Sequence, residues 1–222
     1  MVKIKICGIK RLEDVNIVNK YKPDYIGFVF AKSKRKVTQS MAKSLSQKLA
    51  DEIIPVGVFV DASEDEILNL FNQKTIKIAQ LHGSESEEFI KSLKNKTDNK
   101  LKIIKALEIN KKTDLNNFNT SADYLLLDSG KGSGKTFDWN LINKDLKGKI
   151  FLAGGLNSKN IACAINEFSP YAVDLSSSLE VNGFKDEDKI KEIMEIVKWA
   201  EEDMVNMEVN TYQKHWWMNW FI

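Results

Sequence analysis

Short runs of hydrophobic residues alternate with longer amphipathic segments along most of the chain. The runs are rich in Ile, Val, Leu and Phe and lack strict alternation with polar residues, which is typical of strands covered on both faces. The predicted strands are Ile4–Cys7, Tyr25–Phe30, Ile54–Val60, Ile76–Leu81, Leu101–Leu107, Tyr124–Asp128, Ile150–Ala153 and Tyr171–Leu175. Helical spacing of apolar residues predicts helices over Arg11–Lys20, Ala42–Ala50, Glu64–Phe71, Glu87–Leu93, Ser158–Phe168 and Asp188–Trp199. Ser63, placed three residues before Glu66, and Asn157 are predicted helix caps.

This alternation of strands and helices predicts a parallel sheet. A (β/α)8 barrel uses about 200–250 residues, and the chain has 222. We therefore predict an α/β protein with a single (β/α)8 barrel of parallel strands over residues 1–200. An open doubly wound sheet is the alternative. Residues 201–222 do not follow the pattern, and three of the five tryptophans lie in their last seven positions, so they form a C-terminal tail of unknown role.

Composition narrows the class of protein. Lys+Arg total 33 against 31 Asp+Glu, so no strong field of one sign points to nucleic acid or a membrane. No apolar run reaches the roughly 18 residues of a membrane span, and the N-terminus lacks a signal-peptide pattern. With two cysteines and two histidines, the chain has no disulfide framework and few ligands for a metal. These observations predict a cytoplasmic protein. We expect a monomer or a homodimer, and the sequence does not decide between the two.

Polar and glycine residues stand where the predicted strands end. In a barrel, the carboxyl ends of the strands form the active-site face. The residues at these ends are Cys7-Gly8, the loop from Phe30 to Arg35, Asp61, Gln80–Gly83, Asp128, Gly154-Gly155 and Ser176–Ser178. We expect them to share one mouth.

The last two strand ends indicate a phosphate site. Gly154-Gly155 precedes a predicted helix, so unshielded amides can approach an anion there, and the serines after strand eight add donors. Barrels often bind phosphate between these loops; two ordinary turns are the alternative reading. The segment Gly130–Thr136 resembles a nucleotide-binding loop, but Ser129 stands where that pattern needs glycine, so we reject ATP binding and read a mobile loop near the site.

Cys7 ends the first strand. A free cysteine is usually a small buried hydrophobe, and we expect Cys163 to be one. The pleat sets Cys7 on one face with Lys5, and we expect that face to point into the barrel, where a thiol beside basic groups can act as a base or nucleophile. A lysine inside a packed barrel needs a partner. We predict an ion pair between Lys5 and Asp174 in the neighbouring eighth strand.

Asp128 closes the sixth strand. A helix cap or an exposed carboxylate is the alternative to a catalytic role. With its ordinary pKa of about 3.9, an aspartic acid is protonated in only about one part in a thousand at neutral pH. A general acid here therefore needs surroundings that favour the protonated form, such as a bound phosphate and other carboxylates.

Nine segments in order resemble the phosphoribosylanthranilate isomerase family of tryptophan biosynthesis. They are Lys5–Ile9, Gly27–Phe30, Ser33–Val37, Val56–Val60, Gln80–Gly83, Leu125–Asp128, Gly132–Trp139, Gly154–Asn157 and Val173–Ser177. The resemblance implies an Amadori rearrangement without cofactor or metal, with Asp128 as general acid and Cys7 as general base. It also implies that Arg35 holds the anthranilate carboxylate. The phosphate ligands it implies are Gly154, Gly155, Ser176 and Ser177.

Two features depart from that family. Ser178 and Leu179 stand where glycine and valine are usual, and a β-carbon at Ser178 crowds the phosphate loop if that position needs a positive φ. The tail has no family counterpart, and we interpret it as an appendage without catalytic role. We expect Gln80 to face the barrel interior in a hydrogen-bonding role and His82 to support the mouth.

Two other functions compete with this reading. A sister phosphate-binding barrel, such as an indole-glycerol-phosphate synthase or an aminoaldose isomerase, is one. A decarboxylating cyclisation is expected to use lysine and glutamate at the strand mouths, where this chain has Cys7 and Asp128. The other is a non-catalytic binding protein whose working part is the aromatic tail; deleting Asn206–Ile222 distinguishes it.

Overall fold

The computed structural model describes residues 1–109, 119–128, 149–200 and 202. Eight parallel strands close into a barrel, in chain order, with β8 pairing back onto β1. The strands are β1 (Lys3–Cys7), β2 (Tyr25–Val29), β3 (Ile54–Phe59), β4 (Ile78–Leu81), β5 (Lys102–Glu108), β6 (Tyr124–Asp128), β7 (Ile150–Leu152) and β8 (Ala172–Leu175). The predicted closed barrel is confirmed, and the open sheet is excluded.

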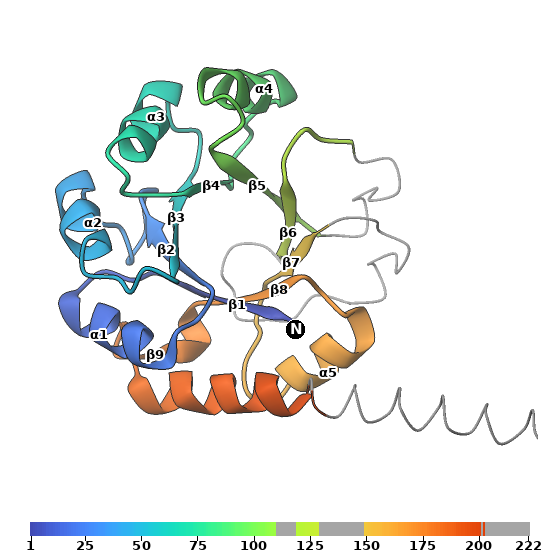
Figure 1. Cartoon of the computed structure of the whole chain (residues 1–222). Coiled ribbons are helices and arrows are strands. Elements are labelled where there is room, and N and C mark those ends of the chain that lie inside the picture. The colour runs from blue at the N-terminus through green and yellow to red at the C-terminus, as the bar shows by residue number, and fades with distance from the viewer. Residues whose placement is uncertain (110–118, 129–148, 201, 203–222) are drawn as a thin grey trace, which may run out of the picture.

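Helices form the outer ring around the strands (Figure 1). They are α1 (Leu12–Tyr21), α2 (Gln39–Ser46), α3 (Glu64–Asn72), α4 (Glu87–Lys96), α5 (Ile161–Phe168) and a last helix over residues 187–200. After β8 come a 3-10 turn (Ser177–Leu179) and a hairpin of β9 (Glu180–Val181) and β10 (Phe184–Lys185). The predicted cap at Ser63 is confirmed, because its Oγ accepts a hydrogen bond from the Glu66 amide at 3.2 Å.

The apolar core has two main parts. One lies between strands and helices and includes Ile6, Phe28 and Leu127. The other fills the barrel interior near the amino ends of the strands, where Phe151 packs against Tyr25 with ring centroids 5.3 Å apart. Interior side chains thus close the barrel from below. The polar residues at the carboxyl ends of the strands stand above this floor.

Two local predictions around α5 are wrong. The helix begins at Ile161 rather than Ser158, and its N-cap residue is Asn160. Asn157 instead accepts a hydrogen bond from the Lys159 amide at 2.9 Å, within the turn before the helix. Cys163 is exposed rather than buried. At helical spacing the inward positions of α5 are those of buried Ile161 and Ala164, which leaves Cys163 on the outer side.

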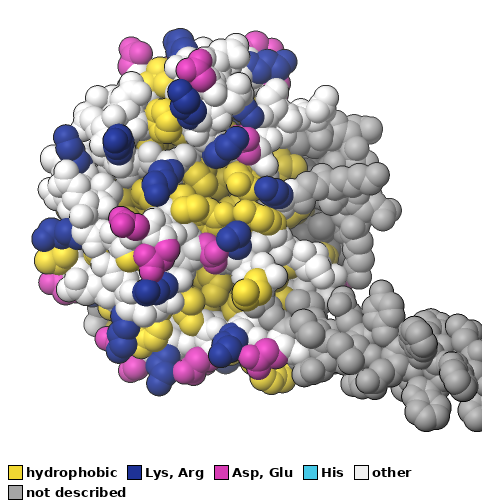
Figure 2. Space-filling model, in the orientation of Figure 1, with side chains coloured by type: hydrophobic (Ala, Val, Ile, Leu, Met, Phe, Trp, Pro, Cys, Tyr) yellow, Lys and Arg dark blue, Asp and Glu magenta, His cyan; other side chains and the backbone are white. Residues whose placement is uncertain are grey.

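Surface charge on the face shown in Figure 2 is mixed. Hydrophobic side chains gather over the barrel, and basic and acidic side chains are interspersed around them. In the part of the chain that the structure describes, no helix is long and apolar enough to cross a membrane. The predicted mobile loop (Gly130–Thr136) and the tail, apart from residue 202, lie outside the described residues.

Candidate functional site

A cavity of about 680 Å³ opens at the carboxyl ends of the strands. This volume lies within the range of small-molecule sites. All the site residues predicted from the sequence line it: Cys7, Arg35, Asp128, Gly154, Gly155, Ser176 and Ser177. Residues from five loops of the barrel therefore meet at one mouth, as the strand ends predict.

Cys7 faces into this cavity from the end of β1. It packs beside Val29 and Val58, and the predicted orientation of its face is confirmed. Room for the thiol comes from Gly27, its partner on β2, because a β-carbon there would lie 2.7 Å from Cys7 Sγ. Burial raises the pKa of the Cys7 thiol, and the nearby Lys5 cation offsets only part of that effect.

Lys5 and Asp174 form the predicted ion pair beneath Cys7. Their strands pair in register, and Lys5 Nζ lies 2.8 Å from Asp174 Oδ2. The exposed fractions of the two side chains are 0% and 8%. Burial lowers the pKa of Lys5, but attraction to Asp174 and Cys7 outweighs burial and leaves this pKa raised, so the lysine stays charged. A cation is thus fixed directly below the thiol.

Asp128 stands at the end of β6 beside His82. Its Oδ2 lies 3.4 Å from His82 Nε2, and His82 Nδ1 lies 3.3 Å from Gln80 Nε2. A histidine that carries its proton on Nε2 satisfies both contacts, accepting from Gln80 and donating toward Asp128. Gln80 faces the interior, as predicted. The three side chains form a line that orients the Asp128 carboxyl toward the cavity.

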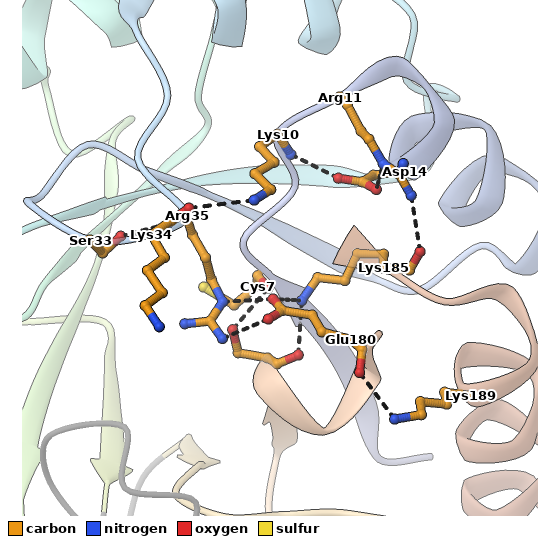
Figure 3. Close-up of polar contacts among 11 residues, drawn as sticks. Cys7, Lys10, Arg11, Asp14, Ser33, Lys34, Arg35, Glu180, Lys185 and Lys189 are labelled. Atoms are coloured by element: carbon orange, nitrogen blue, oxygen red, sulfur yellow. Dashed lines mark hydrogen bonds and ion pairs between the residues drawn. The ribbon is translucent and has the colours of Figure 1, made fainter. Parts of the chain in front are cut away.

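Arg35 is held on two sides. Its Nε and Nη2 donate to the two carboxylate oxygens of Glu180, at 2.6 and 2.8 Å (Figure 3). Its aliphatic stem crosses Gly8, where a β-carbon would lie 2.4 Å from Arg35 Cδ. Gly8 also has a φ of +90°, which disfavours any other residue there. The glycine after Cys7 therefore gives the arginine its path across the mouth.

The predicted anion-binding loops differ in their local structure. Gly154 and Gly155 both have positive φ, at +82° and +69°, so their amides are presented without β-carbons in the way. Ser176 is already engaged, since its Oγ donates to the Cys7 carbonyl at 3.1 Å. Ser178 is not among the residues with positive φ, so the crowding considered for that position does not arise.

Metal ligands are not clustered in the described residues. No group of three or more His, Cys, Asp or Glu side chains in that part of the chain is arranged to hold a metal ion. The chemistry that this site offers is that of a thiol, a carboxyl, a guanidinium and a loop for an anion.

The family model of N-(5'-phosphoribosyl)anthranilate (PRA) isomerase matches residues 4–196 of the chain. The chain belongs to this family. A PRA isomerase from Endomicrobium trichonymphae is 47% identical over 203 residues, which cover 89% of this chain and 99% of the relative. The PRA isomerase structure from Thermotoga maritima has a TM-score of 0.79 and 37% identity, with 89% of this chain and 99% of that one covered.

A third comparison is a PRA isomerase in complex with reduced 1-(o-carboxyphenylamino)-1-deoxyribulose 5-phosphate. It has a TM-score of 0.77 and 35% identity and covers 89% of this chain and 99% of that one. The ligand that this PRA isomerase binds is a phosphate ester with an aromatic carboxylate. In the chain described here, the glycines of the seventh loop and the basic side chain of Arg35 line the same cavity.

Sequence reasoning missed Glu180 and Lys185, which support Arg35 in this PRA isomerase family member. A signal was present: Asn182-Gly183 is the dipeptide most typical of a two-residue hairpin turn. Both residues have positive φ, at +51° and +78°, as such a turn requires. The hairpin places Glu180 and Lys185 side by side on its two strands. Reading the dipeptide would have located the pair beside the eighth loop.

Proposed function

We propose that the protein catalyses the Amadori rearrangement of N-(5-phosphoribosyl)anthranilate to 1-(2-carboxyphenylamino)-1-deoxyribulose 5-phosphate, in tryptophan biosynthesis. The observation that carries the proposal is that Cys7 and Asp128 line one cavity together with Arg35 and the two glycine- and serine-bearing loops. Cytoplasmic location and a monomeric or homodimeric state stay predictions.

Asp128 is the general acid in this proposal. It protonates the ring oxygen of the phosphoribosyl group, and the C1′–O bond breaks to give a Schiff base with the anthranilate nitrogen. His82 supports this role because its Nε2 lies 3.4 Å from one carboxyl oxygen of Asp128 and helps to fix the orientation of that carboxyl. A fixed carboxyl at reacting distance is what general acid catalysis needs.

Cys7 is the general base in the same scheme. It removes the proton from C2′ of the Schiff base, and the electron pair moves to give an enolamine that becomes the ketone product. The buried Lys5 cation beneath the thiol supports this role, since it stabilises the thiolate that accepts the proton. The C1′–O ring bond breaks, and oxidation at C2′ is balanced by reduction at C1′ within the same molecule, so the reaction needs no external redox partner.

The carboxylate and the phosphate of the substrate are assigned to two different sets of residues. Arg35 takes the anthranilate carboxylate, a task that suits the planar guanidinium fork. Gly154, Gly155, Ser176 and Ser177 take the phosphate through backbone amides and the Ser177 hydroxyl, since the Ser176 hydroxyl already donates to the Cys7 carbonyl. The positive φ of both glycines supports this assignment.

The direct test is an assay of the purified protein with PRA, whose fluorescence disappears as it is consumed. Steady-state turnover with release of the ketose product supports the proposal. No turnover of PRA, together with turnover of indole-glycerol-phosphate precursors or an aminoaldose, would assign the chain to a sister reaction instead.

Substitution Gly27→Ala is expected to reduce kcat about 10- to 100-fold. The new β-carbon would lie 2.7 Å from Cys7 Sγ, so the thiol must shift, and displacements near 1 Å at a reacting group lower rates by up to about 10²-fold. KM should change little, because the anion-binding groups lie elsewhere in the mouth. Full activity in a folded Gly27→Ala variant would mean that the position of the thiol is unimportant.

Substitution Arg35→Ala is expected to raise KM for PRA about 10- to 100-fold, with a smaller change in kcat. The reason is the loss of a charge-assisted bidentate contact to the carboxylate. Lys34→Ala is the matched control, since this neighbouring cation is exposed and does not line the cavity. A kcat loss at unchanged KM would instead assign Arg35 to the chemical step.

A further inference from the structure

The guanidinium of Arg35 is only partly used by the protein. An arginine offers five N–H donors, and Glu180 takes the edge formed by Nε and one hydrogen of Nη2. Among the residues that the structure describes, no side chain or carbonyl pairs with the other edge, formed by Nη1 and the second hydrogen of Nη2, which has the geometry of a second carboxylate fork. In Figure 3 the remaining terminal nitrogen of Arg35 points away from Glu180.

Glu180 is itself held firmly. Lys185 Nζ donates to Glu180 Oε1 at 2.9 Å and to the Ser176 carbonyl at 2.9 Å. Lys189 Nζ donates to the Glu180 carbonyl at 3.0 Å. The exposed fractions are 10% for the Glu180 side chain and 0% for that of Lys185. The carboxylate therefore has little freedom to follow the arginine, and the arginine must align with it.

The cluster has two basic side chains and one carboxylate. Arg35 and Lys185 both contact the single carboxylate of Glu180, and burial lowers the pKa of Lys185 although its contact with Glu180 opposes that effect. Burial raises the pKa of Glu180, but its contacts with Arg35 and Lys185 outweigh burial and leave that pKa lowered, so the carboxylate is ionised. Two basic side chains thus share one carboxylate at the mouth, an arrangement that suits one incoming carboxylate.

We propose that Glu180 is a positioning residue that turns the free edge of the Arg35 guanidinium toward the aromatic carboxylate of the substrate. This inference rests on the proposed function. Glu180 touches the arginine rather than the substrate, so its contribution is to the recognition of the carboxylate. The hairpin β9–β10 and Lys185 also connect this clamp to the phosphate loop, through the Ser176 carbonyl.

The test compares two ligands on wild type and Glu180→Gln. The first is reduced 1-(o-carboxyphenylamino)-1-deoxyribulose 5-phosphate, and the second is the same compound without the carboxyl group. In the glutamine, an NH₂ group faces a guanidinium donor, so one hydrogen bond is lost while Lys185 keeps its acceptor. Calorimetry should give about 10-fold weaker binding of the first ligand and unchanged binding of the second. KM for PRA should rise by the same factor at near-constant kcat.

Controls separate positioning from folding. Glu187→Gln removes a carboxylate from the exposed Lys20–Glu187 pair and should leave both ligands unaffected. Should Glu180→Gln fail to fold, Glu180→Asp keeps the charge for Lys185 but shortens the side chain by a methylene, and the same selective loss is expected. Equal weakening for both ligands, or none for either, overturns the inference. Failure of the wild type to turn over PRA and to bind either ligand overturns the proposed function itself.

Discussion

Replacing Cys7 or Asp128 by alanine is expected to lower kcat for PRA at least about 100-fold, the usual contribution of a positioned acid or base. KM should change much less, since neither residue is assigned to the carboxylate or the phosphate. The fold should survive both changes, because each side chain stands at the end of a strand and lines the cavity, and Cys7→Ala removes only one sulfur from its small cluster with Val29 and Val58. The turnover rate is measured from the loss of PRA fluorescence, in stopped-flow or steady-state experiments.

Cys163→Ala is the matched control for the thiol, since Cys163 is exposed on α5. It should retain wild-type turnover. A pH profile adds an independent reading: the scheme needs Cys7 as thiolate and Asp128 protonated at the same time, so kcat/KM should fall at both acidic and alkaline pH. Because burial raises the pKa of Cys7, the alkaline fall should lie above the ordinary range of a free thiol. Near-full activity in Cys7→Ala would show that another group is the base.

Substitution Lys5→Met is expected to reduce the free energy of unfolding by about 3–5 kcal/mol, the range for breaking one side of a buried ion pair. It leaves Asp174 buried with no cation at Oδ2, and Asp174 Oδ1 has no hydrogen-bond partner among the described residues even in the native protein. Thermal unfolding should show a Tm lower by roughly 6–20 °C for a domain of this size.

The pH dependence of that loss has a definite sign. Burial already raises the pKa of Asp174, and loss of Lys5 removes the main opposing attraction. In the variant, the folded state therefore holds a proton that the unfolded state releases, so stability falls as pH rises from acidic toward neutral. The double substitution Lys5→Met with Asp174→Leu should recover most of the loss. Lys20→Met, at an exposed pair, should change little.

Much of the fold followed from the pattern of residues. The eight strands were predicted within a few residues of their observed bounds, because each is an apolar run buried on both faces. The pleat of β1 was enough to predict that Cys7 faces the cavity and that Lys5 needs the partner found in Asp174. The residues of the candidate site could be predicted from the carboxyl ends of the strands, because a barrel brings these ends together on one face.

Side-chain partners outside the strands were less accessible to sequence reasoning. Glu180 follows β8 and contacts Arg35 in the loop after β2, across 145 positions of the chain. The Asn182-Gly183 dipeptide indicates the hairpin that carries Glu180 and Lys185, but no local pattern indicates the contact with Arg35. The exposure of Cys163 depended on where α5 begins, and the turn over residues 158–160 moved that start. Tertiary contacts, rather than propensities, decided these features.

Packing that stabilises the barrel and the residues of the candidate site lie at opposite ends of the barrel axis. Tyr25, Tyr124, Phe151 and Tyr171 pack together near the amino ends of the strands. The acid and base stand at the opposite ends. A protein engineer can therefore strengthen the packing at one pole for heat resistance and leave the reacting groups at the other untouched. Among the described residues, the cavity that a ligand would enter lies at the pole opposite this packing.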